Sequence, residues 1–216
     1  MPRQYKPDYV ILRGWGVMNP TALKEAQRVK FPADRIVGVW WSGSEEDVIP
    51  AGPAAVGYRA AGFHSAGTDF PVIQDMIRHL YDQGQGDMDP RRVGTIYFNR
   101  AVAMAVLGTE AIRDAMAMVG ENRPVTGAEV QAALEQLTID EARLERLGAT
   151  GLLPEIRTSC RNHGGDSPVK FLQWDGDAWK EDTGWIETDQ SIVRPLVEES
   201  AAGYAREKGI TPRTCR

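Results

Sequence analysis

The sequence is poor in the features that assign a chain quickly to a class. It holds two cysteines and three histidines in 216 residues, which argues against a disulfide-rich scaffold or a multi-zinc domain. Lys and Arg (25) are fewer than Asp and Glu (30), and the net charge of −5 argues against a dedicated nucleic-acid-binding protein. No apolar run approaches the roughly 20 residues of a membrane helix. What remains is a globular chain, 42% hydrophobic and 25% charged, long enough for one core or two small lobes.

A secretory signal is also missing from the first residues. Residues 1–6 carry some positive charge, but no apolar segment follows them before the first predicted strand. Taken literally, this predicts a cytoplasmic protein. Taken as a piece of a longer protein, the same start says nothing about the compartment.

Motifs of covalent catalysis are missing as well. The sequence has neither a Gly-x-Ser-x-Gly elbow nor a phosphate-binding loop. A metal site from Cys160, His163 and Asp166 is conceivable, but its spacing matches no recognised set of ligands. The acidic residues 45–47 are interpreted as the solvated start of a helix, where negative charge suits the helix dipole. The sequence therefore favours binding over catalysis, with no metal ion and no cofactor.

The most informative feature that is present is a strand followed by a helix at the start of the chain. Residues 9–12 form a short, mostly apolar run, as a buried parallel strand requires, and a Gly-Trp-Gly turn follows at 14–16. Asn19 can cap a helix whose first position is Pro20. Ligands of open α/β sheets bind at the carboxyl ends of the strands. The turn is therefore predicted to lie at a ligand-facing edge.

Strands and helices alternate along the rest of the chain, which predicts an α/β fold with an antiparallel element added. Residues 64–69 are predicted to form a loop that crosses between lobes, and Pro195 fits the last helix only in its first turn. The predicted elements are strands at 35–40 and 57–63, helices from 72 to the glycines at 84–86, at 94–119, 126–137, 140–147 and 192–208, and a hairpin at 169–180 that residues 185–186 extend.

Tryptophans stand at the predicted strand ends. Trp15 follows the first strand and Trp40 ends the second, so both should lie along one sheet edge, where indoles offer flat apolar walls and an N–H donor. Trp41 should point the other way. The alternative is that these rings only cap the core. Three further tryptophans in the hairpin region are interpreted as packing residues: Trp174, Trp179 and Trp185.

The order and spacing of several segments resemble a known family, the type I periplasmic solute-binding proteins, which are the branched-chain amino acid receptors of ABC importers. The likeness is to the carboxyl-terminal portion of these proteins and covers nearly the whole chain. The tail resembles a branch associated with aromatic or other non-amino-acid ligands. The segments that carry the resemblance are 7–16, 22–26, 36–38, 51–58 and 97–102, and in the tail 151–154, Cys160, 173–176 and 194–201.

The resemblance implies a partial type I periplasmic-binding-protein fold: parallel sheets flanked by helices, two lobes, the amino-terminal part missing, and a C-terminal β-hairpin. Residues 1–62 would be part of the distal, second lobe. Residues 63–216 would belong mainly to the first lobe, with crossovers, hairpin and C-terminal helix. It further implies a periplasmic, non-enzymatic protein that binds a small solute between the lobes and delivers it to the permease and ATPase subunits of an ABC importer. A ligand-sensing regulatory domain of the same fold and a small α/β enzyme remain the alternatives.

The resemblance also suggests site residues. Trp15 takes the place of an aromatic wall, and Trp40 that of an acid that binds a ligand's ammonium group. An indole cannot neutralise an ammonium as a carboxylate does, although a cation–π contact is a weaker substitute, so an aromatic or apolar carboxylate is expected rather than an aliphatic amino acid. Tyr97, Asn99 and Arg100 are candidates from the first lobe. Arg100 would pair with the ligand's carboxylate, or it is a surface or structural arginine.

Two further expectations concern the chain as a whole. Composition leaves open whether the two cysteines are unrelated thiols, but the resemblance implies a disulfide between Cys160 and Cys215, worth about 3–4 kcal/mol in the loop-entropy model. A parallel strand without neighbours exposes unpaired backbone, so the chain alone is expected to be marginally stable or to self-associate through its sheet edge.

Overall fold

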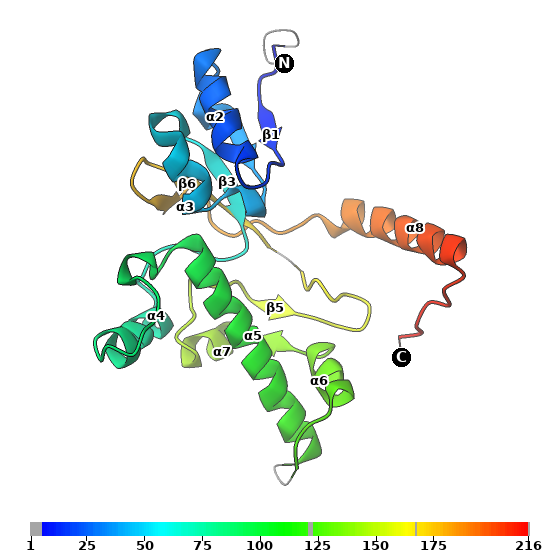
Figure 1. Ribbon diagram of the computed structural model, residues 1–216. Helices are drawn as coiled ribbons and strands as arrows, with labels where there is room; N and C mark the ends of the chain where they lie inside the picture. Colours follow the sequence, from blue (N-terminus) through cyan, green and yellow to red (C-terminus); the bar gives the residue numbers. More distant parts are fainter. Residues whose placement is uncertain (1–5, 121–122, 167, 216) are drawn as a thin grey trace.

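A five-stranded sheet lies at one end of the computed structural model and a group of helices at the other (Figure 1). The structure describes residues 6–120, 123–166 and 168–215. The sheet order is β1-β2-β3-β6-β7. Its parallel strands are β1 (Val10–Leu12), β2 (Ile36–Gly38) and β3 (Arg59–Gly62), and its antiparallel hairpin consists of β6 (Lys170–Trp174) and β7 (Trp179–Glu181). The α/β class with an added hairpin is confirmed.

Short helices pack on the sheet and complete a first unit. They are α2 (Met18–Arg28) and α3 (Glu45–Val48), with 3-10 segments η1 (Ala33–Arg35), η2 (Trp40–Ser42) and η3 (Ile49–Ala55). The core of this unit buries Leu23 and Val48 from the helices against Tyr58, Trp174 and Trp179. Two of the three hairpin tryptophans are thus packing residues, with ring centroids 5.5 Å apart.

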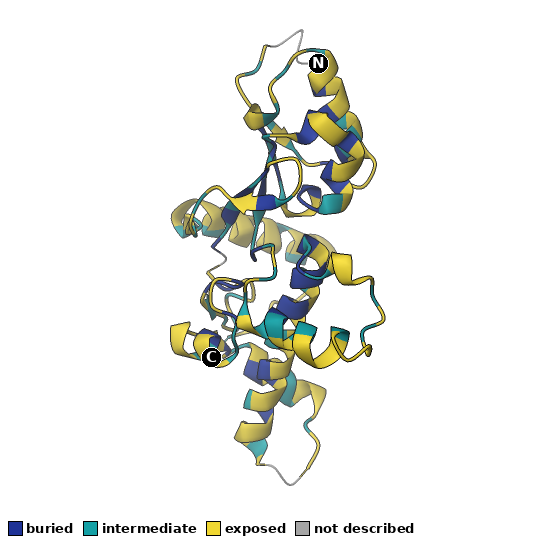
Figure 2. Ribbon diagram, turned by 90° about the vertical axis from the view of Figure 1, so that its left-hand side faces the viewer, coloured by how far each residue is buried: buried dark blue, intermediate teal, exposed yellow. Residues whose placement is uncertain are grey.

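A second core lies among the helices between β3 and the hairpin. Long helix α5 (Ile96–Val119) packs against α6 (Gly127–Leu134), which begins at a capping box formed by Thr126 and Glu129. The other elements of this unit are α4 (Pro71–Met76), the π-helical η4 (Ile77–Tyr81), η5 (Pro90–Arg92), β4 (Thr138–Ile139), α7 (Glu141–Arg146) and β5 (Ile156–Arg157). The two cores share no residue, and Figure 2 shows buried residues in both halves of the elongated chain.

The hairpin returns to the sheet of the first unit. Leu172 lies opposite Ala60, because β6 pairs antiparallel with β3. The division into lobes at residue 62 stays a prediction. The hairpin belongs to the segment 63–216, which was expected mainly with the first lobe, but its pairing places the hairpin beside the first three strands. Ile186 extends the hairpin as predicted, through a bridge to Val169.

Helix α8 (Gln190–Lys208) projects from the rest of the chain (Figure 1), and none of its residues is buried, although Arg194 donates to the carbonyl of Arg161 at 3.0 Å. Asp189 caps it by accepting the Ser191 N–H at 3.0 Å, so the helix begins earlier than predicted and Pro195 falls in its second turn, not its first. Beyond α8, the disulfide between Cys160 and Cys215 forms as the resemblance implied, with a Cα–Cα distance of 5.6 Å.

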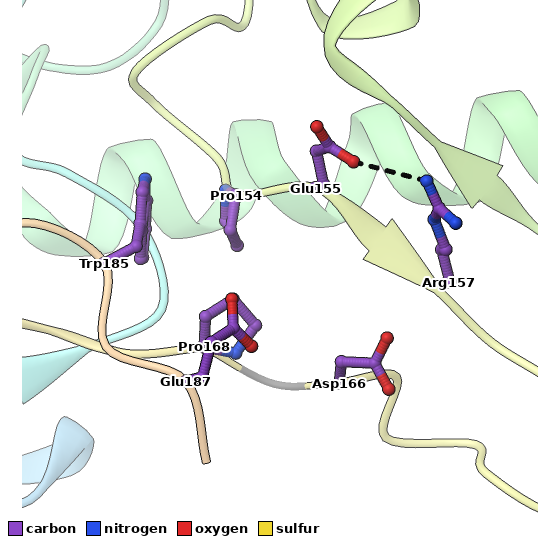
Figure 3. Close-up of a pocket in the computed structure, with 7 residues that line it drawn as sticks. All are labelled: Pro154, Glu155, Arg157, Asp166, Pro168, Trp185 and Glu187. Atoms are coloured by element: carbon purple, nitrogen blue, oxygen red, sulfur yellow. Dashed lines mark ion pairs between the residues drawn. The ribbon is translucent and has the colours of Figure 1, made fainter.

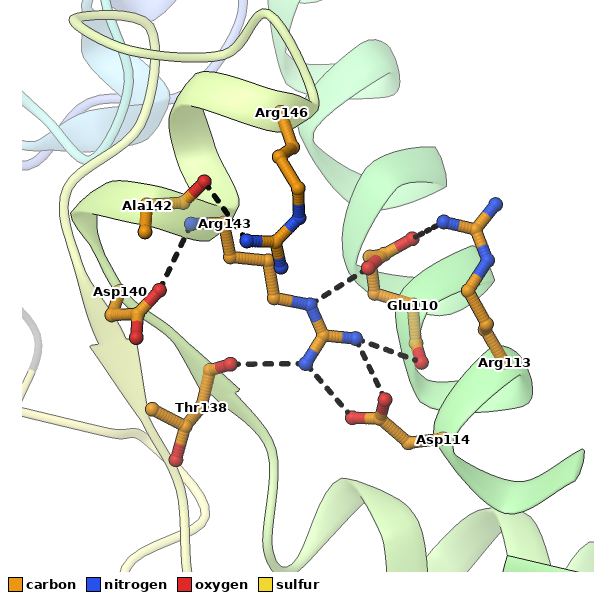
Figure 4. A network of polar contacts seen from close by, with 8 residues as sticks. All are labelled: Glu110, Arg113, Asp114, Thr138, Asp140, Ala142, Arg143 and Arg146. Atoms are coloured by element: carbon orange, nitrogen blue, oxygen red, sulfur yellow. Dashed lines mark hydrogen bonds and ion pairs between the residues drawn. The ribbon is translucent and has the colours of Figure 1, made fainter. Parts of the chain in front are cut away.

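An ion-pair network fastens α5 to α7 and β4 (Figure 4). The guanidinium of Arg143 donates from Nε to Glu110 at 2.7 Å and from two nitrogens to Asp114 at 2.8 and 3.0 Å. It also reaches the carbonyl of Thr138 at 3.0 Å. The Glu110 side chain is almost fully buried, and Arg113 supplies a second cation at 2.6 Å. A buried carboxylate is tolerated here because it is paired twice.

Candidate functional site

Buried polar residues hold the loops at the carboxyl ends of the strands. Asn19 does not cap α2, which begins one residue earlier at Met18. Its side chain is fully buried and donates to Asp47 at 2.7 Å. Asp47 is not solvated as predicted, because it also accepts the backbone N–H and the hydroxyl of Ser44, at 2.9 and 2.7 Å. The capping interaction at the start of α3 turns this carboxylate inward.

The turn that carries Trp15 depends on a close approach of backbone and side chain. A Cβ atom on Gly14 would lie 1.9 Å from Oδ1 of Asn19, so only glycine fits. The hydroxyl of Ser42 donates to the carbonyls of Gly14 and Leu12, at 2.9 and 3.2 Å. These bonds join the loop that follows β1 to the loop that follows β2. Trp15 itself projects from the turn with 75% of its surface exposed.

The loop behind β2 brings Trp40 and Trp41 together. Residues 40–42 form a 3-10 turn rather than the end of a strand, so the two indoles do not alternate in direction, and their ring centroids are 4.9 Å apart. The hydroxyl of Tyr58 fixes the turn by donating to the Ser42 carbonyl at 2.8 Å. In the described part of the chain, the aromatic contacts of Trp40 are with Trp41 and Phe63, and none joins it to Trp15.

Arg100 reaches this loop from the first turns of α5. Its Nη2 donates to the carbonyl of Trp40 at 2.9 Å. Its guanidinium carbon lies 4.9, 5.2 and 5.5 Å from the ring centroids of Trp40, Tyr97 and Phe63. Its Nε is buried without a hydrogen-bond partner. We call Trp40, Trp41, Phe63, Tyr97 and Arg100 the aromatic–arginine cluster. Burial lowers the pKa of Arg100 below the ordinary range of arginine, but arginine stays charged in proteins at neutral pH.

His64 and Asn99 lie beneath the cluster. His64 is 1% exposed, and burial, together with the charge of Arg100, lowers its pKa to about 4. Its ring is therefore neutral near pH 7. Asn99 is fully buried and donates to the carbonyls of Ser65 and Gly67 at 3.0 and 2.9 Å. It holds the crossover behind β3 and has no solvent-exposed surface, which does not favour the predicted ligand contact.

The cluster contains one residue that the sequence reasoning missed. Phe63 follows β3 directly and meets both Trp40 and His64 edge-on, with centroids 5.7 and 5.1 Å away. The rule that singled out Trp15 and Trp40, an aromatic residue at the carboxyl end of a parallel strand, applies equally to Phe63. The exposed members of the cluster are Trp40 (42%), Trp41 (37%) and Tyr97 (41%).

Two of the cavities in the described structure lie away from the cluster. One of about 600 Å³ is lined by residues of α3, η5 and β7, and Trp179 lies on its wall. The other, of about 450 Å³, lies next to β5 (Figure 3), where Trp185 and two prolines face charged side chains and Glu155 pairs with Arg157 at 3.6 Å. Lys170 lies 4.3 Å from the ring centroid of Trp185. The cluster lines neither cavity and forms an open surface.

The described part of the chain offers neither a metal-binding cluster nor a membrane-spanning helix. Residues 6–120, 123–166 and 168–215 contain no group of three or more His, Cys, Asp or Glu side chains placed to hold a metal ion. Cys160, which the sequence set beside His163 and Asp166, is engaged in the disulfide. None of the helices described has both the length and the hydropathy needed to cross a membrane.

Comparison with known proteins assigns the family. The sequence model of the periplasmic binding protein family matches residues 2–180, and the chain therefore belongs to this family. The comparison with curated proteins gives no match. The chain thus has, in part, the type I periplasmic binding fold.

Solved structures agree with this assignment. A crystal structure described as an ABC transporter permease from the Pseudomonas fluorescens group is 42% identical and superposes with a TM-score of 0.94, over 100% of this chain and 52% of that one. A branched-chain amino acid ABC transporter from Thermus thermophilus with bound valine is 18% identical, with a TM-score of 0.67 over 88% and 49% of the two chains. A solute-binding protein from R. palustris in complex with benzoate is 13% identical, with a TM-score of 0.56 over 87% and 46%. The chain spans about half the length of these relatives.

Proposed function

We propose that this protein is the solute-binding component of an ABC-type importer, and that the aromatic–arginine cluster is one wall of its ligand site. The observation that carries the proposal is the state of Arg100: a charged guanidinium among three rings, with a buried Nε that lacks a partner. A guanidinium binds carboxylates strongly and aromatic rings bind flat apolar bodies. Trp40 and Phe63 come from the segments that follow β2 and β3, and Tyr97 and Arg100 come from α5.

We further propose that the ligand is an aromatic or apolar carboxylate rather than an aliphatic amino acid. The five residues of the cluster include one cation and no acid. The carboxylate whose charge acts on Arg100 is Asp47, and its oxygens already accept hydrogen bonds from Asn19 and Ser44. An α-ammonium group would therefore be desolvated at the cluster without a counter-charge. Trp15, exposed on the neighbouring loop, is proposed as a further wall contact.

The compartment and the partners follow from the same proposal. A periplasmic location is supported by the family and by the disulfide between Cys160 and Cys215, because disulfides persist in oxidising compartments. The partners would be the permease and ATPase subunits of the importer. Nucleic acid is not expected as a partner of a chain with net charge −5.

Binding without catalysis is also supported by the burial and hydrogen bonds of two serines that could otherwise act as nucleophiles, Ser65 and Ser42. Ser65 lies 2.9 Å from Nζ of Lys170, the pairing that a Ser–Lys nucleophile needs. Both residues are buried, however, and the Ser65 hydroxyl donates to the carbonyl of Gly151 at 2.7 Å. The Ser42 hydroxyl likewise donates to backbone carbonyls. Neither serine is in reach of a substrate.

Titration with benzoate and with valine tests the proposal. Tryptophan fluorescence and calorimetry should show saturable binding of benzoate in the millimolar range or tighter, and none of valine. Arg100→Gln should weaken benzoate binding at least tenfold, because it removes the charge that faces the carboxylate. Arg113→Gln, an exposed change on the same helix, is the matched control and should bind as the native chain does.

Two results would contradict these expectations. Binding of valine but not of benzoate would exclude the proposed ligand class. Benzoate binding that Arg100→Gln leaves unchanged would remove the aromatic–arginine cluster from the ligand site.

A further inference from the structure

We propose that the disulfide between Cys160 and Cys215 is a redox-labile latch, which an anionic thiol of low molecular weight, such as glutathione, opens by attack on Cys160. The thiol enters through a cavity that none of the residues of the aromatic–arginine cluster lines. The proposal concerns how the end of the chain is held, and it does not depend on which solute the protein binds.

A cavity of about 440 Å³ gives access to one of the two sulfur atoms. It is lined by residues of the loop 160–165 and of the segment 188–197. Cys160 lies in its wall, whereas Cys215 is not among the described residues that line it. The rate of thiol–disulfide exchange depends on which sulfur is attacked and on access to that sulfur. A thiol in this cavity therefore meets Cys160, and Cys215 becomes the leaving group.

The ionisable side chains on the wall of this cavity are basic. They belong to Arg161, His163 and Arg194, and no Asp or Glu of the described residues lines the cavity. Within the described residues neither arginine takes part in an ion pair, and Arg194 donates to the carbonyl of Arg161 at 3.0 Å. Cationic surroundings raise the local concentration of an anionic reactant and favour the thiolate over the thiol. The cavity therefore favours a thiol that carries carboxylate groups.

Acidic side chains near the cavity are engaged with other groups. Asp189 caps α8 by accepting the N–H and the hydroxyl of Ser191, at 3.0 and 2.6 Å. Glu135 accepts from Nη2 of Arg213 at 2.9 Å, and its carboxylate lies 3.5 Å from Nε2 of His163. Glu135 thus offsets the charges of Arg213 and His163. Arg161 and Arg194 supply the positive charge that faces the cavity at neutral pH.

Glu135 also keeps the opened latch together. Arg213 stands close to Cys215 in the sequence, and His163 stands close to Cys160. Since the Glu135 carboxylate contacts both Arg213 and His163, it holds the tail beside the loop after the disulfide is broken. No residue of α8 is buried, so packing within the described chain contributes little to this anchoring. The two sulfur atoms therefore stay close enough for the bond to form again.

The reaction balances with glutathione as the one co-reactant. Its thiolate attacks Sγ of Cys160, and a new S–S bond forms while the bond to Cys215 breaks. The electron pair of the broken bond stays on Sγ of Cys215, which takes a proton from water. The products are a mixed disulfide at Cys160 and a free thiol at Cys215. Attack of the Cys215 thiolate on Sγ of Cys160 reverses the step and releases glutathione.

The rates at which thiols of different charge open the disulfide test this inference. Mercaptopropionate, mercaptoethanol and cysteamine are small thiols that are anionic, neutral and cationic. Each is reacted with the folded chain and with the chain unfolded in urea, which corrects for the intrinsic reactivity of the thiol. The ratio of the mercaptopropionate rate to the cysteamine rate should be about fivefold higher, or more, for the folded chain. High salt should bring this ratio toward the value of the unfolded chain.

Substitutions at the cavity wall locate the effect. Arg161→Gln and Arg194→Gln should each lower the folded-chain ratio by about twofold or more, and the double variant should abolish the preference for the anionic thiol. Arg206→Gln, near the other end of α8, removes the same charge and is the matched control. Far-UV circular dichroism shows whether each variant is folded. After reaction with glutathione and alkylation of free thiols, peptide mass spectrometry should find glutathione on Cys160 and the alkyl group on Cys215.

Several results would overturn the proposal. Glutathione found on Cys215 would show that the other sulfur is attacked. A thiol preference equal to that of the unfolded chain, or one that the double variant retains, would exclude the cavity as the entrance. Opening that is no faster than global unfolding, measured by hydrogen exchange, would show that thiols reach the bond only in the unfolded chain.

Discussion

The carboxylate of Glu45 accepts the backbone N–H of Ile96 at 3.0 Å, and this bond joins the two units of the chain. Glu45 lies on α3, which packs on the sheet, and Ile96 is the first residue of α5. Beside it, Glu46 forms an ion pair with Arg92. A helix N-terminus favours an anion. The same position removes Glu45 from water, and this desolvation raises its pKa above the ordinary 4.5.

Glu45→Gln should therefore stabilise the protein near pH 7. A raised pKa means that the folded state favours the protonated acid. The contribution of Glu45 to stability is therefore largest below pH 4.5 and declines as the pH rises through its folded-state pKa. Glutamine is neutral and keeps an acceptor for Ile96. Urea unfolding near pH 4 and pH 7 should give equal stabilities for variant and native chain at the lower pH and a more stable variant at the higher. A variant that is less stable at pH 7 would show that the helix dipole outweighs desolvation.

His64 should control the acid side of the stability profile. Its pKa falls from 6.5 to about 4 on folding, so the unfolded chain binds the proton more readily. Stability is then fully present above pH 6.5 and is lost as the pH falls toward 4, by roughly 3 kcal/mol. His64→Gln should flatten this slope in urea unfolding. His79→Gln, at an exposed position, should leave it unchanged; a native chain equally stable at pH 4.5 and 7 would contradict the prediction.

Arg143→Ala should lower the free energy of unfolding by about 3 kcal/mol, because it leaves the buried carboxylate of Glu110 with Arg113 as its remaining partner. Arg146→Ala is the matched control on the same helix. Within the described residues, the hydrogen bond of the Arg146 side chain is to the carbonyl of Ala142, and its loss should change stability by less than about 0.5 kcal/mol. Chemical denaturation of both variants measures the difference, and equal effects would show that the network of Figure 4 adds nothing to stability.

Replacement of Cys160 and Cys215 by serine should cost the chain alone less than the 3–4 kcal/mol of the loop-entropy model. That model assumes that the cross-link restricts only the unfolded chain. Here α8 has no buried residue, so the bond also restricts the motion of α8 in the folded state. This restriction offsets part of the bond's effect on the unfolded chain, and we expect a loss of at most about 2 kcal/mol. Unfolding of native and double-variant chains measures it, with a thiol assay that should find no free cysteine in the native chain. A loss above 3 kcal/mol would show that α8 is held by packing.

Much of the fold could be predicted from local patterns. Signals within a few residues predicted the strand at 9–12, the helix that begins at residue 126 and the hairpin at 169–180. Each of these predictions corresponds to an observed element. Asn19 was assigned wrongly because a polar residue before a helix fits a cap, whereas a contact 28 residues away, with Asp47, decides its role. The pairing of β6 with β3 is likewise set by contacts more than 100 residues apart in sequence.

The candidate site, like the fold, was predictable from the sequence only in part. The sequence by itself determined which residue types stand at the carboxyl ends of the parallel strands, and so it determined that Trp15 and Trp40 lie in the loops at that edge of the sheet. Only the tertiary structure decided that a 3-10 turn brings Trp41 against Trp40, that Phe63 completes the group, and that α5 lays Arg100 across it. The physical reason is that strand and helix periodicity acts between near neighbours, whereas the distance from a guanidinium to a ring depends on how two separate units pack.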